Sequence, residues 1–431
     1  MYMERRLELN TQLPLILIAL LAFAELVSPA RVWVYLFVGI TGLTLAAYLW
    51  ARQMRDNVHL VRQTRGTWVT VGDALEEFFV IRNLGFLPVL WAEVHDRSNI
   101  PGYNVSRVVA CDAQGEYRWT TKGVCRRRGV YTLGPTEVRM GDPFGLFQVT
   151  LRYPETDTIL VYPRVMHLPS LELPRGAASG RARASQRSHE RALMAATVRL
   201  YQPGDSLHLI HWPISAHRGE LMVKEFDTEL SGNLWIILDL DEAVQAGEGE
   251  ESTLEYGVIL AASLASELLR HGERRAVGLV AFGQQQTFLL PQPGQAQLWR
   301  ILRALASATP SPEWPLRQVL TDVGPVLGHG QTVAIITASL STDWLPALLP
   351  LTRRGISSAV ILMDPSSFDG REPSDETIAS LRGLWAEHRI ASHVIRQGYP
   401  FRPLIRQIRR RVEYKVLGTG RVVPVVVEEE V

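Results

Sequence analysis

The chain has 431 residues, 46% of them apolar and 21% charged, which is enough for two or three domains with sizeable cores and excludes wholesale disorder. Lys and Arg number 45 and Asp and Glu 44, so the net charge of +1 provides no overall field that would draw the protein to nucleic acid. The two cysteines, Cys111 and Cys125, fit no zinc-binding spacing. We interpret them as buried or half-buried thiols, with a disulfide in an oxidising compartment as the alternative.

Two apolar runs open the chain and predict a transmembrane helical hairpin over residues 1–57, with spans at about 12–29 and 32–51. The second run carries no charge from Val32 to Trp50 and meets the length of about 20 apolar residues that a membrane span requires. The first run, from Leu13 to Val27, is marginal in length for a membrane span. A cleaved signal peptide is the alternative for it, but a second run follows at once and no small-x-small cleavage site is obvious.

Charges beside the two runs predict the orientation of the hairpin. Arg5 and Arg6 precede the first run, Arg52 and Arg55 follow the second, and the connecting loop offers only Arg31. Cytoplasmic flanks of membrane spans carry the excess of Lys and Arg. We therefore expect a protein of the cell membrane, with two spans surrounded by lipid and with its soluble body in the cytoplasm.

Residues 58–165 are typical of a β-sandwich. Residues 67–71 and 78–81 are β-branched and aromatic, and turn signals such as residues 112–115 and 133–135 separate stretches of this kind. Short strands at this spacing indicate two sheets packed face to face.

Residues 166–198 are expected to form a basic linker. Arg, Ala, Ser and Gly dominate the stretch between residues 174 and 190, and no apolar period survives there. A solvated loop is the simpler interpretation, and contact of its arginines with anionic lipid is the alternative.

Residues 231–397 alternate between strand and helix patterns. The apolar run Leu234–Leu238 is typical of a strand buried on both faces, and the helical period of residues 253–271 ends before Gly272. The other strands are expected at 276–282, 287–290, 332–336, 359–363 and 391–395, and the other helices at 295–307, 344–353 and 376–388. This alternation predicts an open, mostly parallel sheet with helices on both faces. Residues 398–431 are expected to form a basic helix and a short β tail.

The most distinctive stretch, residues 199–230, lies between the two predicted domains. Its notable residues are a tyrosine, a Pro-Gly-Asp turn, a Trp, an Arg-Gly pair and a Lys-Glu ending, namely Tyr201, Gly204, Asp205, Trp212, Arg218, Gly219, Lys224 and Glu225. Together with residues 128–131 and 142–147 of the β-domain, these motifs resemble the bacterial family called domain of unknown function 58 (DUF58). The resemblance extends from the hairpin to about residue 365.

Two interpretations of residues 199–230 remain open. The first makes the stretch a brace between domains, with Trp212 buried under the α/β domain, and the second makes it a partner-binding surface. His208 and His217 stand where the family usually has arginine, which puts a family contact of those cations in doubt. A metal site built from His208, His211 and His217 is less well supported, because no cysteine accompanies them and carboxylates are few nearby.

The α/β domain resembles a von Willebrand factor A domain, which usually binds Mg²⁺ through Asp-x-Ser-x-Ser after its first strand and a second aspartate after its fourth. Asp239 matches the first position, but Asp241 and Ala243 replace both serines and Ala338 replaces the second aspartate. Asp239 and Asp241 thus make at most a degenerate, weak site for Mg²⁺ or Ca²⁺. The simpler interpretation is that they solvate a loop or cap a helix, and we expect no cofactor.

The sequence contains no Ser/His/Asp arrangement, phosphate-binding loop or His-Glu-x-x-His motif, so we expect no enzyme. The family resemblance implies a companion of MoxR-type AAA+ ATPases. The leading hypothesis is a membrane-anchored scaffold or adaptor for protein binding that helps to assemble a complex. The alternatives are a divalent-cation-dependent adhesion module and a hydrolase that uses Asp239 and Asp241.

Overall fold

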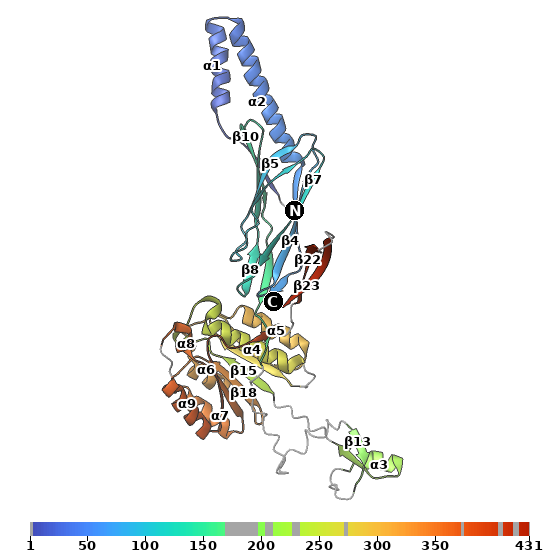
Figure 1. Ribbon diagram of the computed structural model, residues 1–431, viewed down its shortest axis with the longest axis vertical. Coiled ribbons are helices and arrows are strands. Elements are labelled where there is room, and N and C mark those ends of the chain that lie inside the picture. The colour runs from blue at the N-terminus through green and yellow to red at the C-terminus, as the bar shows by residue number, and fades with distance from the viewer. Residues whose placement is uncertain are drawn as a thin grey trace. The chain divides into compact units, whose positions relative to one another are not determined.

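The computed structural model divides into two compact units, which are described separately here (Figure 1). The first unit comprises Met1–Arg164 and Leu302–Ala308, and the second Val165–Ile301 and Thr309–Val431. The structure describes residues 3–168, 197–202, 210–225, 233–270, 275–371, 375–403, 408–416 and 422–430.

The first unit combines an apolar helical hairpin with short β-sheets. Its helices are α1 (Leu13–Val27) and α2 (Arg31–Asn57). Its strands are β1 (Glu4–Leu9), β2 (Val58–Thr64), β3 (Trp68–Thr70), β4 (Ala74–Asn83), β5 (Val89–Asp96), β6 (Arg107–Cys111), β7 (Glu116–Val124), β8 (Gly129–Leu133), β9 (Thr136–Gly141), β10 (Phe147–Tyr153) and β11 (Asp157–Tyr162). The sheet orders are β1-β10-β9-β5-β6, β2-β4-β7 and β3-β11-β8.

The sheets β1-β10-β9-β5-β6 and β2-β4-β7 pack around a shared apolar core. In β4, alternate residues are buried, as expected for a strand with one face turned inward. Phe79 of β4 stacks on Trp119 of β7 with ring centroids 5.2 Å apart, and both belong to one core cluster with Met140 of β9 and Leu151 of β10. The β-strand pattern predicted for residues 58–165 is therefore present, with sheets that face each other.

The N-terminal region differs from the predicted hairpin of residues 1–57. Residues Glu4–Leu9 form strand β1, which pairs antiparallel with β10 from Glu4↔Arg152 to Leu9↔Phe147. The apolar runs that follow hide this strand in the sequence, because six residues of alternating charge and leucine are a short signal beside them. The helix α2 has 27 residues and is long and apolar enough to cross a membrane, whereas α1 has 15.

The lower part of α2 is built into the β-domain. Ala51 and Met54 are buried in the same core cluster as the strands, and the Tyr48 ring meets Phe147 edge-on at 5.7 Å. The Trp50 indole donates a hydrogen bond to the Pro88 carbonyl at 3.2 Å. Since β2 begins at the residue after α2, no linker separates the helix from the sheet.

A buried charge cluster centred on Arg62 joins the two facing sheets. Arg62 of β2 donates to both carboxylate oxygens of Glu77 in β4 at 2.8 Å, and to Asp96 at the end of β5 at 2.8 Å. Glu77 is fully buried and also accepts a hydrogen bond from the Tyr103 hydroxyl. Burial opposes the charged guanidinium, yet Glu77 and Asp96 raise the pKa of Arg62 above its usual value.

The second unit contains an α/β domain and several smaller elements. Its helices are α3 (Trp212–Arg218), α4 (Thr253–Arg270), α5 (Gln295–Ala306), α6 (Leu316–Val323), α7 (Leu345–Arg353), α8 (Pro365–Asp369) and α9 (Asp375–Glu387), with 3₁₀ turns η3 (Glu242–Val244) and η4 (Gly249–Glu251). Its strands are β12 (Met166–His167), β13 (Thr197–Leu200), β14 (Met222–Glu225), β15 (Leu234–Leu238), β16 (Val277–Phe282), β17 (Gln286–Gln292), β18 (Thr332–Thr337), β19 (Ser357–Met363), β20 (Ala391–Ile395), β21 (Arg402–Pro403), β22 (Ile408–Val416) and β23 (Val422–Glu430).

The main sheet of this unit has the order β17-β16-β15-β18-β19-β20 and is parallel except for the edge strand β17. Every residue of β15 and β18 is buried, because helices cover both faces. On one face α4 approaches so closely that a Cβ added at Gly257 would lie 3.0 Å from Leu238. On the other face, Trp235 belongs to one core cluster with Leu320 of α6 and Trp344, the residue before α7. The open sheet agrees with the alternation in the sequence, which missed α6 and α8.

The C-terminal residues correct another prediction. Instead of a basic helix, residues 408–416 and 422–430 form the antiparallel hairpin β22–β23, in register from Ile408↔Glu430 to Val416↔Val422. The arginines at 409–411 are compatible with a helix, but β-branched valines dominate the second half and favour a strand.

The Arg62 cluster yields a stability prediction. Replacing Arg62 with methionine leaves Glu77 and Asp96 buried without their cation, and should lower the free energy of unfolding by about 3–5 kcal/mol. Equilibrium denaturation of the full chain in detergent, followed by tryptophan fluorescence, measures this loss. The control is Arg82→Met, because Arg82 pairs with Glu116 at the surface, where such pairs contribute about 0–1 kcal/mol. Equal, small losses in both variants would contradict a cluster that joins the sheets.

Candidate functional site

The stretch with the family motifs folds as a small module, which we call the signature module and define as β13, α3 and β14 with their connections. Strands β13 and β14 pair antiparallel, and the Tyr201 amide extends the ladder by donating to the Leu221 carbonyl at 2.8 Å. Ile210, Met222 and Val223 are buried and provide an apolar centre. Lateral strand pairing and this centre position the short helix α3.

Local capping explains where α3 begins and ends. The His211 ring nitrogen Nδ1 accepts a hydrogen bond from the Ile214 amide at 3.3 Å, which caps the first turn. Gly219 ends the helix with φ 72°, a left-handed conformation that favours glycine. The Ser215 hydroxyl accepts from the Met222 amide at 2.8 Å and ties the helix to β14. His211 Nδ1 already accepts this hydrogen bond. It is therefore not available as a ligand for the metal site considered for the three histidines.

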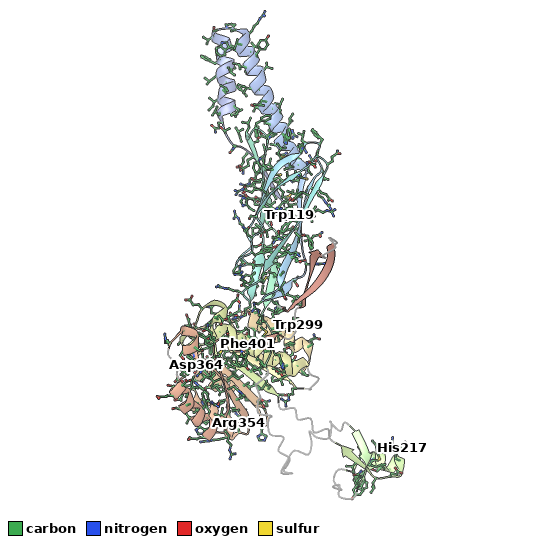
Figure 2. All side chains as sticks on the ribbon, in the orientation of Figure 1. Trp119, His217, Trp299, Arg354, Asp364 and Phe401 are labelled. Carbon is green, nitrogen blue, oxygen red and sulfur yellow. The ribbon has the colours of Figure 1, made fainter. Side chains whose placement is uncertain are left out.

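Trp212 is exposed within the signature module. Its side chain, at the first position of α3, is 63% exposed, and burial under the α/β domain stays a prediction. Leu200 and Leu221 of the same module are 56% and 43% exposed. We call Leu200, Trp212 and Leu221 the apolar surface of the signature module. Arg218 and His217, at the other end of α3, are also exposed (Figure 2).

The other signature residues are placed in part. Gly204 and Asp205 lie in residues 203–209, outside the described residues. Lys224 and Glu225 form the end of β14, opposite Val198 and Thr197 of β13.

A second group of polar residues lies at the carboxyl edge of the main sheet. Asp239 follows β15 and is only 3% exposed. One of its carboxylate oxygens accepts from the Thr337 hydroxyl at 2.6 Å, and the other accepts from the Asp241 amide at 3.1 Å. Burial raises the pKa of Asp239 to about 6, against the lowering effect of these two hydrogen bonds.

The carboxylates of Asp239 and Asp241 already accept hydrogen bonds from the protein itself. Both Asp239 oxygens are engaged, and the Asp241 carboxylate accepts from the Ala243 amide at 3.0 Å, which caps η3. Within the described part of the chain, no group of three or more His, Cys, Asp or Glu side chains is placed to hold a metal ion. Capping, the simpler interpretation of Asp241, is therefore what its side chain does.

The sequence analysis did not identify Asp364 and Arg396, which also lie at the carboxyl edge of the main sheet. Asp364 follows β19, is fully buried and accepts from the Ser366 amide at 3.2 Å (Figure 2). Arg396 follows β20, with its Nε 3.3 Å from the free carboxylate oxygen of Asp364. The Asp-Pro pair directly after a buried strand is a helix-cap signal that could have found Asp364. The charges of Asp364 and Arg396 neutralise each other, and the Asp364 side chain caps α8.

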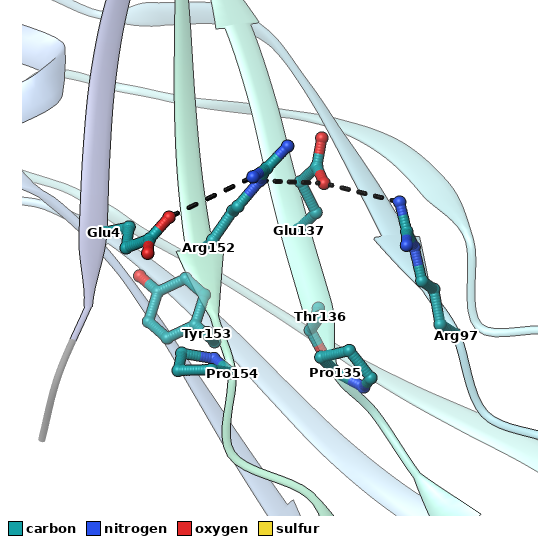
Figure 3. Close-up of a pocket in the computed structure, with 8 residues that line it drawn as sticks. All are labelled: Glu4, Arg97, Pro135, Thr136, Glu137, Arg152, Tyr153 and Pro154. Atoms are coloured by element: carbon teal, nitrogen blue, oxygen red, sulfur yellow. Dashed lines mark ion pairs between the residues drawn. The ribbon is translucent and has the colours of Figure 1, made fainter.

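A pocket of about 330 Å³ lies on the sheet of the first unit (Figure 3). Opposite charges on neighbouring strands line it: Arg152 lies 4.0 Å from Glu4 and 3.4 Å from Glu137, and Arg97 lies 3.9 Å from Glu137. Burial would raise the pKa of Glu137, but Arg139 and its other cationic neighbours lower it below its usual value. The row is a set of charge pairs between neighbouring strands that stabilises the sheet.

The cysteines of the first unit offer no reactive site either. Cys111 and Cys125 are both free and buried, and burial raises the pKa of each thiol. The disulfide alternative is therefore not realised in this structure.

Comparison with known proteins finds a family model that matches the signature module and most of the α/β domain. Residues 197–369, from β13 to the end of α8, match the family described as "Protein of unknown function DUF58". The uncharacterized protein YeaD of Bacillus subtilis is 25% identical over 319 residues, which cover 72% of this chain and 78% of YeaD. An uncharacterized protein of Mycobacterium tuberculosis is 22% identical over 171 residues, which cover 39% of this chain and 54% of that protein.

Solved structures resemble this chain only remotely. The CARDB domain of a Pyrococcus furiosus protein, crystallised with di-metal ions, has 16% sequence identity and a TM-score of 0.18, and the match covers 25% of this chain and 90% of that domain. Likeness at this level carries no argument about function. The DUF58 resemblance recognised in residues 199–230 is thus confirmed for residues 197–369.

The buried Asp239 predicts a pH dependence of stability. A carboxyl group whose pKa is about 6 when folded and about 4 when unfolded stabilises the protein below pH 4 and loses that contribution as the pH rises through 6. Relative to Asp239→Asn, the wild type should therefore lose about 2–3 kcal/mol of unfolding free energy between pH 4 and pH 7. Denaturant unfolding at several pH values measures the difference. Asp322→Asn, which removes an exposed carboxylate of α6, is the control. A difference that does not vary with pH would contradict the assignment.

Proposed function

We propose that this chain is a membrane-anchored, non-catalytic adaptor that binds proteins through its second unit and works with a MoxR-type AAA+ ATPase in assembling another complex. The observation that supports the proposal most is the exposed apolar surface of the signature module, which lies in the family-matched stretch. Trp212 is the central feature of that surface, and tryptophan is enriched among the residues that dominate binding energy at protein interfaces. Contiguous exposed apolar patches mark interaction sites, and the proposal takes these three side chains to form one.

A non-catalytic role agrees with the state of the polar groups. The hydrolase alternative requires Asp239 or Asp241 to act on a substrate, but Asp239 is 3% exposed and Asp241 caps η3. The adhesion alternative requires a cation at the same place, where the carboxylate oxygens already accept hydrogen bonds. Protein binding requires neither an accessible carboxylate nor a bound cation at Asp239 and Asp241.

We extend the proposal to the fold of the second unit, which we take to be von Willebrand factor A-like. In support, Asp239 stands at the carboxyl end of β15, where such a domain has its first metal ligand. Ligand and partner sites of open parallel sheets lie at the carboxyl ends of the strands. The domain would then be a binding module in which the metal-dependent contact has been lost.

The anchor of the adaptor is the hairpin of α1 and α2. The helix α2 has the length and apolarity of a membrane span, and the two helices run antiparallel side by side (Figure 1). The arginines that flank the apolar runs favour a cytoplasmic body. We therefore place the protein at the cell membrane with both units on the cytoplasmic side.

Partner binding through Trp212 is testable by affinity capture. Full-length tagged protein extracted from native membranes in detergent should recover an AAA+ ATPase, identified by mass spectrometry. Trp212→Ala should lose that ATPase, since truncating a hot-spot residue costs at least about 2 kcal/mol of binding free energy. Its unfolding free energy should change by no more than about 0.5 kcal/mol, because the side chain is exposed.

The matched control for this experiment is Trp68→Ala, which truncates a tryptophan that is 50% exposed in the first unit. The Trp68→Ala variant should still recover the ATPase. If both variants recover the ATPase as well as the wild type does, the signature module is not the binding surface. If no AAA+ ATPase is recovered at all, the proposed partnership is wrong.

The orientation has its own test. A reporter that is active only outside the cytoplasm, fused after Val431, should stay inactive. The same reporter fused after Ser28, in the loop between α1 and α2, should be active, because a hairpin that crosses the bilayer has its loop on the opposite side. Activity at the C-terminal fusion would overturn the cytoplasmic placement of the body.

A further inference from the structure

The free part of the hairpin is shorter than a bilayer is thick. The helix α1 has 15 residues and is about 22 Å long. Residues 31–46 of α2, which precede the buried Ala47, reach about 24 Å. The hydrocarbon core of a typical bilayer is about 30 Å thick. If the β-domain stood clear of the membrane, the hairpin would fall short of the far side.

The β-domain is held at the base of this hairpin and cannot move away from it. Ala51 and Met54 of α2 are buried in the core of the sandwich. At the N-terminal end of the hairpin, β1 is paired with β10 along its whole length, so the chain enters α1 from a sheet. A hairpin fixed at both ends brings the nearest part of the β-domain to the membrane whenever the helices insert.

Two loops of the β-domain border the hairpin base. Residues 142–146 meet the start of α1, where the Asn10 amide donates to the Leu146 carbonyl at 2.8 Å. Residues 84–88 run beside the last turns of α2, where the Leu84 amide donates to the Asn57 carbonyl at 3.0 Å. In Figure 1, β5 and β10 lie at the hairpin end of the β-domain and β8 at the opposite end.

These loops and the adjoining start of β5 expose large apolar side chains. We call this group the rim and define it as Leu84, Phe86, Leu90, Trp91 and Phe144, which are 65%, 74%, 50%, 39% and 49% exposed. Trp91 of β5 packs against the end of β9, directly before residues 142–146, because a Cβ added at Gly141 would lie 2.7 Å from the Trp91 ring. Neighbouring residues 112–115 are polar, and the Gln114 amide donates to the Gly85 carbonyl at 2.9 Å.

We propose that the rim is a second membrane-binding element, seated in the interfacial layer of the phospholipid bilayer into which the hairpin inserts. Sinking the rim into that layer compensates for the few ångströms by which the hairpin is short. Exposed aromatic and apolar side chains are the residues that favour this layer, and the polar residues 112–115 would face the headgroups. The inference rests on the proposed membrane anchor and adds to it a fixed, close approach of the β-domain to lipid.

The contacts at the base also predict an order of depth. The loop with Phe144 is bonded to Asn10, three residues before α1 begins, and so lies close to the inserted part of the hairpin. The loop with Phe86 is bonded to Asn57 and Trp50, near the end of α2 and further from its tip. Phe144 should therefore lie deeper in the bilayer than Phe86.

Fluorescence quenching of the full chain tests the proposal. Phe144→Cys, Phe86→Cys, Leu20→Cys and Val130→Cys variants are labelled with an environment-sensitive dye and reconstituted in liposomes of phosphatidylcholine and phosphatidylglycerol. The native cysteines are buried, and unlabelled wild type serves as the blank. Leu20 is an exposed residue in the middle of α1, and Val130 is an exposed residue of β8.

Labels at positions 144 and 86 should be quenched several-fold more by nitroxide-bearing lipids, and several-fold less by aqueous iodide, than the label at position 130. The lipid effect should be larger at position 144 than at position 86. If position 20 is in lipid while positions 144 and 86 respond to iodide as position 130 does, the rim proposal fails and the anchor stands. If position 20 itself responds to iodide, the membrane anchor is wrong. Protection from both quenchers at positions 144 and 86 would mean that protein covers the rim, which also overturns the proposal.

Discussion

The direct passage from α2 into β2 determines how the first unit is organised. A helix that ends at Asn57 and a strand that begins at Val58 leave no residues for a hinge. Because Met54 is also buried in the sandwich core, bending at this junction would expose apolar surface as well as strain the backbone. The hairpin and the β-domain therefore move together, and any force on one is transmitted to the other.

The Arg62 cluster gives the β-domain the stiffness that such transmission requires. Glu77 and Asp96 come from strands of different sheets, and one guanidinium holds both. A buried cation between two carboxylates tolerates little displacement, since each ångström of separation leaves charge without a partner in a medium of low polarity. Apolar packing alone, such as Phe79 on Trp119, would allow the sheets to slide more freely.

Sequence patterns predicted the parts of the fold that rest on periodicity. The buried strand Leu234–Leu238 and the helix Thr253–Arg270 were found within a residue or two, because burial on both faces and a helical period leave plain signals. The strand Glu4–Leu9 and the hairpin of residues 408–430 were missed, because long-range or hairpin pairing decided them more than local composition did. At the candidate site, Asp239 was found through a motif. The exposure of Trp212 was not predicted, because no sequence pattern distinguishes a tryptophan buried in a core from one exposed at an interface.

The pairing of β1 with β10 has a consequence for biosynthesis. Residues Glu4–Leu9 leave the ribosome well before their partners, Phe147–Arg152, which follow only after about 140 further residues have been made. At a synthesis rate of roughly 5–20 residues per second this delay is on the order of ten seconds. The apolar hairpin is complete long before then, so β1 spends the interval as an unpaired edge tethered beside α1. Its charged residues, from Glu4 to Glu8, keep the unpaired strand soluble and discourage pairing with other chains.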